Sequence, residues 1–461
     1  MKRLAVIGGG ISGLAAATTA ARCAGRLPGG LEVVVFEREP RIGGKAWSLD
    51  DNGWLVEAGP TGFLDNEPAL DGLIEHAGLV KVPANAAAAR RFVVHRERMR
   101  ELDPNPLKFA TAGILGPLGL LRILGEPFVG RRAAEAGDDE SVWDFAARRL
   151  GRQAADRLIA PMVLGVYAGD ARELSLAAAF PKLAELEREY GSLIRGMLAR
   201  RRAGRLQGGG PTGPGGALTS FEGGLQALPL ALARRGNFEV RSGCPVRALE
   251  AAGDGRWRLR VAGDSLTADA VVLAGEPWAM AALLPQAAQP IARELDAIDC
   301  PAVTVAALGF DDAAAARVPR GFGVLIPRGA GYRILGCLWD SFLFAGRSPE
   351  GALLVRAMLG GATDPGAAEL DDDALLGVVR ADLVRLLGIT AAPIHTRIVR
   401  WQRAIPQYEL NHLARVARIE KALAELPGLH IAGNALHGIA FGKAAAAGVA
   451  AGERTVQGLL G

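Results

Sequence analysis

The chain has 461 residues, half of them apolar, and its 53 basic and 49 acidic side chains leave a net charge of only +4. This length exceeds what one ordinary hydrophobic core serves, so we expect two or three lobes. A nucleic-acid surface is excluded because no basic face is interleaved with aromatic residues, and a membrane span is excluded because no apolar run reaches ~18–20 residues.

The first predicted elements form a nucleotide-binding strand, turn and helix. The apolar run 4–7 leads into Gly8-x-Gly10-x-x-Gly13, and an Ala-rich helix follows. In this spacing the first glycine allows a tight turn, the second allows close approach to a pyrophosphate, and the third lets the helix pack on the strand. The helix N-terminus would face the diphosphate. A glycine-rich turn that binds nothing is the alternative.

A second apolar run, 31–36, ends at Glu37, which lies 24 residues after Gly13. Its carboxylate can accept hydrogen bonds from ribose hydroxyls and would repel a 2′-phosphate. The pattern therefore favours FAD or NAD over NADP.

Two further motifs follow, Arg41-x-Gly43-Gly44-Lys45 and Glu57-x-Gly59-Pro60. At this point the chain resembles the flavin amine oxidase and protoporphyrinogen oxidase superfamily, in which such motifs lie along the flavin. The resemblance implies FAD rather than NAD.

The resemblance covers nearly the whole chain and narrows to the protoporphyrinogen oxidase family. The matching segments are Gly59–Leu64, Gly165–Asp170, Ser220–Gln226, Gly321–Pro327, Ile334–Gly336, Trp339–Ser341, Met358–Gly361, Arg400–Trp401 and Ile405–Tyr408. Together with the glycine motif, it implies FAD contacts from Gly8, Gly10, Ile11, Ser12, Gly13, Glu37, Arg38, Gly43, Gly44, Lys45, Gly59, Pro60, Thr61, Val246, Trp401, Gly433, Asn434, Gly438, Ile439 and Ala440.

The predicted fold class is α/β: a Rossmann-like FAD-binding domain, a mixed-sheet substrate domain and an inserted helical domain. We assign 1–90, 215–290 and 395–461 to the FAD-binding domain, 91–102 and 291–394 to the substrate domain, and 103–214 to the helical domain.

Within the helical domain, the apolar spacing of Leu183, Leu186, Tyr190 and Ile194 indicates one helix. The apolar segment 112–124 is either a helix pair in a core or an amphipathic patch on a membrane surface; the resemblance favours the patch. The Gly- and Pro-rich segment 208–216 predicts a flexible connector back to the FAD-binding domain.

The remaining elements alternate between strands and helices. Strands are predicted at 238–241, 257–261, 271–275, 304–310, 323–326, 334–338, 353–358 and 429–434, and helices at 371–387 and about 443–459. By resemblance, the N-terminus of the last helix is aimed at the isoalloxazine, where its dipole would stabilise the reduced flavin.

A tetrapyrrole substrate is implied by the family alone. It would lie between Phe322, Leu325 and Leu338, with Met358 nearby; without the resemblance, these four would be interpreted as ordinary strand core. The Gly165 carbonyl is a candidate acceptor for pyrrole N–H groups, or belongs to a plain turn. Lys108 is a candidate partner of a propionate, or a solvated surface lysine.

One departure from the family pattern is the segment Gly438 to Lys443, which lacks the usual Asp-Cys pair. The resemblance as a whole implies FAD-dependent oxidation of protoporphyrinogen IX, with oxygen or a quinone as acceptor. The alternatives are coproporphyrinogen III oxidation, an amine oxidase or desaturase activity, and a non-catalytic flavoprotein.

The expected location is cytoplasmic or peripheral on the inner face of a membrane, since Met1-Lys2-Arg3 leads directly into a strand and no signal peptide precedes it. Four scattered cysteines without a Cys-x-x-Cys pair are typical of a reducing compartment. No cluster of these cysteines with the six dispersed histidines has metal-ligand spacing, so no metal site is expected. The sequence does not specify the oligomeric state, and an oligomer is possible.

Overall fold

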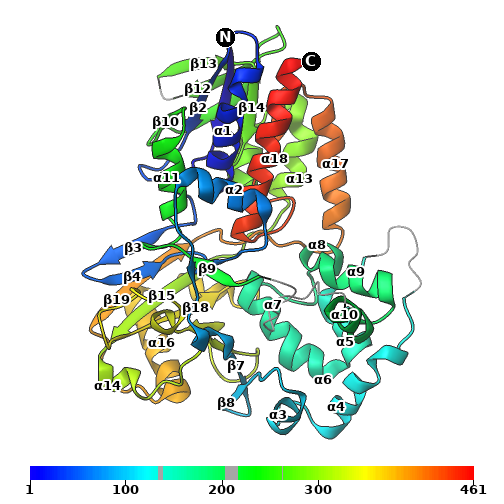
Figure 1. Ribbon diagram of the computed structural model, residues 1–461, viewed down its shortest axis with the longest axis vertical. Helices are drawn as coiled ribbons and strands as arrows, with labels where there is room; N and C mark the ends of the chain where they lie inside the picture. Colours follow the sequence, from blue (N-terminus) through cyan, green and yellow to red (C-terminus); the bar gives the residue numbers. More distant parts are fainter. Residues whose placement is uncertain (133–138, 203–215, 262) are drawn as a thin grey trace.

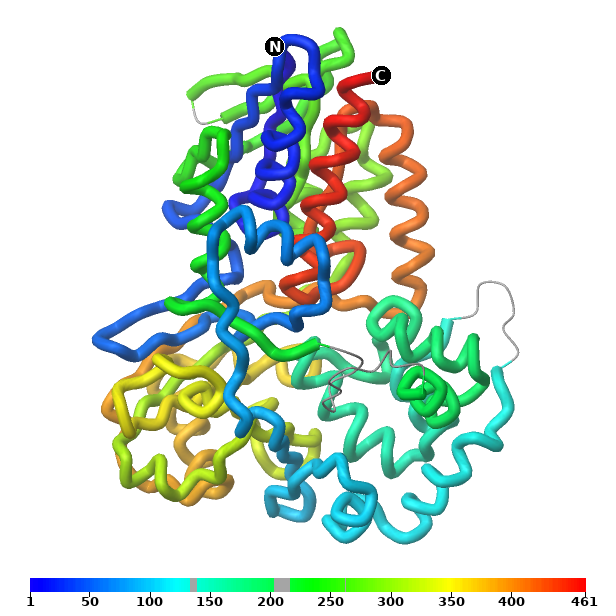
Figure 2. Tube along the Cα trace, in the orientation of Figure 1, coloured from blue at the N-terminus to red at the C-terminus, as the bar shows by residue number. Residues whose placement is uncertain are grey.

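The computed structural model describes residues 1–132, 139–202, 216–261 and 263–461. Figures 1 and 2 show an upper lobe that carries both termini, and below it a second sheet beside a lobe of short helices. The α/β class is confirmed. Most of the predicted connector, 208–215, lies outside the described residues.

The upper lobe is built on a five-stranded parallel sheet. Its order is β10 (Glu239–Arg241), β2 (Leu31–Phe36), β1 (Lys2–Ile7), β14 (Ala270–Leu273) and β20 (Leu429–Ile431). These strands are mostly apolar because helices and a small sheet cover both faces. All carboxyl ends meet at one edge, which in open parallel sheets is where ligands bind.

Two helices that run in the same direction cover one face of this sheet (Figure 1). They are α1 (Ile11–Cys23) and α18 (Phe441–Leu460), the predicted terminal helix. Gly448 faces the backbone of Ser12, and Gly452 faces that of Ala16, so neither position has room for a side chain. The remaining helices of the lobe are α2 (Pro68–Ala77), α11 (Ala227–Arg235), α12 (Pro277–Leu283), α13 (Gln289–Asp296) and α17 (His412–Ala424).

The lower sheet has seven strands. Their order is β19 (His395–Trp401), β15 (Val303–Phe310), β18 (Leu353–Gly360), β17 (Gly336–Leu338), β16 (Gly323–Leu325), β7 (Phe92–His95) and β8 (Arg98–Glu101). The predicted strands of this region are confirmed within two residues at most ends. Beside the sheet lie α14 (Asp312–Ala315), α15 (Asp340–Leu343) and α16 (Asp372–Leu387).

Strand β19 differs from the expected organisation, which grouped 395–461 with the amino-terminal strands. It pairs with β15 without a break, from Trp401 opposite Val303 to His395 opposite Gly309. Because its backbone is paired in the lower sheet, the first seven residues of 395–461 belong to that sheet, and the crossing to the upper lobe comes after Trp401.

The lobe of short helices lies beside the lower sheet (Figure 1). It contains α3 (Pro106–Thr111), α4 (Pro117–Leu124), α5 (Val142–Leu150), α6 (Arg152–Ala154), α7 (Ala160–Tyr167), α8 (Leu176–Ala179), α9 (Pro181–Tyr190) and α10 (Leu193–Arg202).

The single helix predicted over 183–194 is wrong, because Gly191 ends α9 in a left-handed conformation. The buried carboxylate of Glu126 then accepts hydrogen bonds from Leu193 N and Ile194 N at 2.9 and 3.2 Å. These bonds satisfy the free amides of a new helix start, so α10 begins separately.

Three small sheets complete the fold. They are β3 (Ser48–Asp51) with β4 (Trp54–Glu57); β5 (Phe63–Leu64), β9 (Leu218–Ser220) and β6 (Val82–Pro83); and β11 (Val246–Ala251), β12 (Trp257–Val261) and β13 (Asp264–Ala268).

Candidate cofactor and substrate site

The turn between β1 and α1 has no room for a side chain at Gly8, and the first turn of α1 has none at Gly13. Gly8 has φ +119°, and a Cβ there would lie 2.6 Å from the carbonyl oxygen of Ala274. A Cβ on Gly13 would overlap the carbonyl oxygen of Gly8. Gly10 begins α1 without a side-chain cap, so the first amides of the helix, including those of Ile11 and Ser12, have no side-chain partner there. A bare helix N-terminus of this kind attracts a phosphate.

The second glycine block crosses this turn. Gly43 N donates to Gly9 O at 2.9 Å, and a Cβ on Gly44 would lie 3.3 Å from the Cα of Gly10. Arg41 closes the block by donating to Gly44 O at 2.7 Å. The two glycine motifs therefore form one backbone cradle at the carboxyl edge of the parallel sheet.

Glu37 is buried at the end of β2, beside this cradle. Its carboxylate accepts hydrogen bonds from Gly9 N at 2.8 Å and from Glu39 N at 2.9 Å. Cys244 N donates to Glu37 O at 2.8 Å, which brings the start of β11 and Val246 to the same place. Arg38 is exposed and pairs with Glu39. The geometry suits a carboxylate that holds a ribose.

Two buried polar atoms next to the cradle lack partners. Lys45 lies 2.6 Å from one carboxylate oxygen of Glu276, which follows β14. Glu276 Oε2 and Trp278 Nε1 are buried and have no hydrogen-bond partner, and the one partner of Lys45 Nζ that the structure shows is the first Glu276 oxygen. Buried polar groups are normally satisfied. A polar cofactor in the cradle would supply what these atoms lack, so the residues present fit FAD.

The segment that follows β4 lies against the same cradle. A Cβ on Gly59 would overlap the carbonyl oxygen of Lys45. Trp401 donates from Nε1 to Ala58 O at 2.7 Å, just before Gly59 and Pro60. The end of β19 and the 58–60 segment are thereby joined.

Arg356 ties this segment to the lower sheet. It is buried, pairs with Asp340 at 2.9 Å, and donates to the carbonyl oxygens of Glu57 and Gly59, both at 2.7 Å. It also contacts Thr61 Oγ1. This one guanidinium connects the predicted FAD segment to the sheet that carries the predicted substrate residues.

The loop before α18 closes the cradle from the other side. Gly433 has φ +116°, and a Cβ there would lie 3.8 Å from Ser12 Oγ. The loop continues through Asn434, Gly438 and Ile439 to Ala440, which begins α18 without a side-chain cap. The sequence therefore brings a second uncapped helix N-terminus to this region.

Lys443 at the start of α18 and His437 in the preceding loop each lie beside a glutamate. Lys443 lies 2.6 Å from Glu67 and is 56% exposed, so a carboxylate neutralises the cation that departs from the family pattern. His437 is exposed and lies 3.2 Å from Glu420.

Three of the predicted tetrapyrrole residues, Leu325, Leu338 and Met358, share one face of the lower sheet, whereas Phe322 precedes β16. Leu325, Gly336 and Met358 lie opposite one another on β16, β17 and β18, and Leu338 lies one row further, beside Arg356. The three apolar side chains are half-buried, although most residues of these strands are buried. A half-buried apolar face is what a flat hydrophobic ligand could cover.

Gly165 lies in α7 and not in a plain turn. A Cβ there would lie 2.5 Å from the side chain of Leu325, so the helix touches the apolar face. Gly165 is in the last turn of α7, where helix carbonyls lose their intrahelical donors.

Lys108 is 70% exposed and lies 3.4 Å from Asp103, whereas Arg91 lies over the Phe322 ring at 4.7 Å. Arg91 Nε is buried without a hydrogen-bond partner, and burial lowers the Arg91 pKa. Sequence reasoning missed Arg91, although its alternation with Val93 places it on the face of Leu325.

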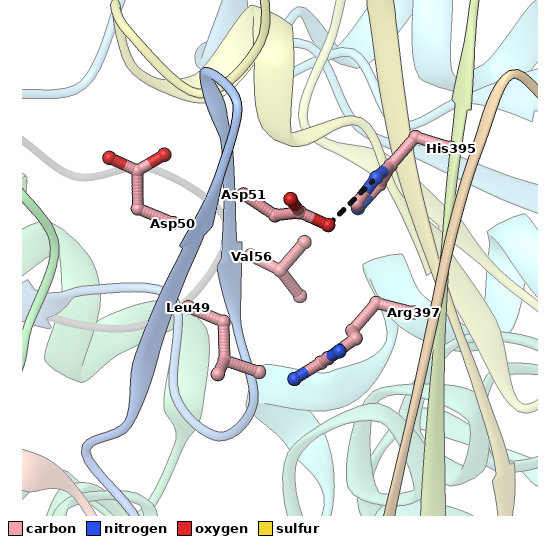
Figure 3. Close-up of a pocket in the computed structure, with 6 residues that line it drawn as sticks. All are labelled: Leu49, Asp50, Asp51, Val56, His395 and Arg397. Atoms are coloured by element: carbon pink, nitrogen blue, oxygen red, sulfur yellow. Dashed lines mark ion pairs between the residues drawn. The ribbon is translucent and has the colours of Figure 1, made fainter.

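A cavity of about 300 Å³ lies elsewhere, between the β3–β4 hairpin and β19 (Figure 3). Asp51 faces His395 across it at 3.8 Å, while Asp50 points away from that pair. A second cavity of about 490 Å³ continues along β19 beside α16. None of the predicted tetrapyrrole residues lines either cavity.

Comparison with known proteins supports the assignment of the cradle as a flavin site. The coproporphyrinogen III oxidase of Bacillus subtilis is 30% identical, covering 95% of this chain and 94% of its own. Protoporphyrinogen oxidase 2 of Arabidopsis thaliana is 31% identical, covering 99% and 94%. A solved structure from Exiguobacterium sp. 255-15, provisionally named protoporphyrinogen oxidase, has a TM-score of 0.85 at 26% identity and 99% coverage of both chains.

More distant structures share the fold. Cyclohexylamine oxidase from Brevibacterium oxydans has a TM-score of 0.70 at 18% identity, with 100% of this chain and 98% of that chain covered. The family described as flavin containing amine oxidoreductase matches residues 11–459. This chain is therefore an FAD-dependent oxidoreductase and belongs to the flavin-containing amine oxidoreductase family.

Proposed function

We propose that this chain oxidises protoporphyrinogen IX to protoporphyrin IX, with FAD as the immediate electron acceptor. The observation that carries the proposal is the half-buried apolar face of Leu325, Leu338 and Met358. Arg356 links that face directly to the Gly59–Thr61 segment. Relatives named protoporphyrinogen oxidase support the substrate class.

Bound FAD supplies two-electron oxidation, and a porphyrinogen loses six electrons, so the substrate is oxidised in three rounds. The chain itself binds and orients the macrocycle. The Gly165 carbonyl accepts a hydrogen bond from pyrrole N–H, the apolar face excludes water, and Arg91 pairs with a propionate. Dioxygen or a quinone then takes the electrons from the enzyme.

Coproporphyrinogen III is the second candidate substrate, as the Bacillus subtilis relative's name suggests. Its four propionates require more cations. Arg328 is exposed and donates to the carbonyl oxygen of Gly360, two residues beyond Met358. Desolvation of the guanidinium lowers the Arg328 pKa, as it does for Arg91.

The test mixes the oxidised protein anaerobically with each porphyrinogen. We expect flavin bleaching and porphyrin fluorescence with protoporphyrinogen at a higher kcat/KM than with coproporphyrinogen. The reverse order would make the second candidate the substrate. A protein that holds FAD but is bleached by neither would be a non-catalytic flavoprotein or would act on another class, such as amines.

We also propose peripheral attachment to the inner face of a membrane. Leu107, Leu118, Leu121, Leu124 and Phe128 of α3, α4 and the turn after α4 are 66–86% exposed. This docking patch would bury its side chains at a bilayer surface. In the described parts of the chain, no helix has the length and apolar character needed to span a bilayer.

Glutamate at Leu121 should abolish co-sedimentation with anionic lipid vesicles, because a carboxylate opposes burial and is repelled by the lipid. Ile394→Glu is the matched control: Ile394 is 67% exposed and Leu121 66%, but Ile394 lies outside the docking patch. Equal vesicle binding by both variants and the unmodified protein would contradict the proposal.

A further inference from the structure

A buried aromatic cluster connects the helical lobe to the loop before α18. Tyr408 is fully buried, stacks on His412 with ring centroids 4.1 Å apart, and meets Tyr167 edge-on at 6.0 Å. Tyr167 belongs to α7, the helix that carries Gly165. None of these three side chains has a role in the function proposed above.

Two of these side chains hold the loop that follows β20. Tyr408 Oη donates to the carbonyl oxygen of Asn434 at 2.6 Å. His412 Nε2 lies 3.1 Å from the carbonyl oxygen of Leu436. Burial lowers the His412 pKa to about 4, so near neutral pH the ring is uncharged and Nε2–H can donate. Residues 433–436 are thereby fixed at two carbonyls.

The neighbouring Gln407 contacts the end of α7. Its Nε2 donates to the carbonyl oxygens of Tyr167 and Ile405, both at 2.9 Å. A Cβ on Gly169 would overlap Gln407 Oε1, so the end of α7 is packed tightly against this side chain. Consecutive residues 407 and 408 therefore contact the α7 end and the loop.

We propose that Tyr408 and His412 are positioning residues for FAD, which they hold through the backbone of residues 433–436. The inference rests on the proposed placement of FAD beside this loop. The loop amides and the N-terminus of α18 can bind a flavin only if the loop keeps one backbone conformation. The hydrogen bonds from Tyr408 and His412 hold it in that conformation. Gln407, the residue before Tyr408, donates to the backbone of α7 and so connects the loop to the helix that carries Gly165.

The test is Tyr408→Phe, with Tyr167→Phe as its matched control. Both tyrosines are buried in one cluster, and each donates its hydroxyl to a backbone carbonyl, Tyr167 to Ala179 O at 3.0 Å. Only the Tyr408 bond reaches the flavin loop. Both variants should therefore lose similar thermal stability, since each loses one buried hydrogen bond.

Tyr408→Phe should release FAD from the holoenzyme about three- to tenfold more readily, the size expected for one buried hydrogen bond. Its flavin absorption spectrum and midpoint potential should also shift, while Tyr167→Phe keeps the unmodified values. Equal changes in both variants, or none in either, would overturn the proposal. If Tyr408→Phe does not fold, His412→Phe removes the second bond and must show the same flavin changes.

These readouts separate the inference from the substrate assignment. They report on FAD alone, so inactivity toward both porphyrinogens would overturn the proposed function and leave this test valid. Unmodified protein that contains no FAD would overturn the cofactor placement and, with it, this inference.

Discussion

The substitution Gly13→Ala should lower the affinity for FAD by a factor of at least about 100. The added Cβ would overlap the carbonyl oxygen of Gly8, so the backbone of the cradle must move. Losing two hydrogen bonds to a charged group, at about 1.5–3 kcal/mol each, accounts for this factor. The measurement is flavin absorbance relative to protein after purification.

Gly25→Ala is the control for this substitution. Gly25 lies in the same βαβ segment, and a Cβ there would meet nothing within 4 Å. It should therefore retain the full flavin content. A Gly13→Ala protein as yellow as the control would show that the cradle does not bind the diphosphate.

Local patterns predicted most strands of the two large sheets, and helix α16, because each pattern depends on neighbouring residues. The run 31–36 matches β2 in full, and 371–387 matches α16 within one residue. The break between α9 and α10 could not be predicted in this way. It depends on Glu126, which lies 67 residues before Leu193 and caps the second helix.

The site residues likewise divide into those that local patterns predict and those that only the fold brings together. The glycine turn and Glu37 could be predicted because the motif specifies its own backbone geometry. Arg356 could not, since it reads as one charge within an apolar strand, and its partners Asp340 and Gly59 are brought together only by the fold. Arg91 was missed because its contact with Phe322 requires β7 and β16 to be neighbours.

Methionine at Arg91 should raise KM for the porphyrinogen about 10- to 100-fold, because a charge-assisted hydrogen bond to a propionate contributes about 1.5–3 kcal/mol. The same substitution should leave the melting temperature unchanged or higher. Arg91 Nε is buried without a partner, and no carboxylate of the described residues pairs with this guanidinium. A cation that is desolvated without a carboxylate partner destabilises the substrate-free fold.

Lys108→Met provides the matched control, since Lys108 is the cation that the sequence suggested for the same task. Its ammonium is mostly exposed and pairs with Asp103 at the surface, where such pairs contribute little. KM should therefore stay unchanged. A large rise in KM for Lys108→Met, with none for Arg91→Met, would move the propionate site to α3. A lower melting temperature for Arg91→Met would show instead that Arg91 stabilises the fold.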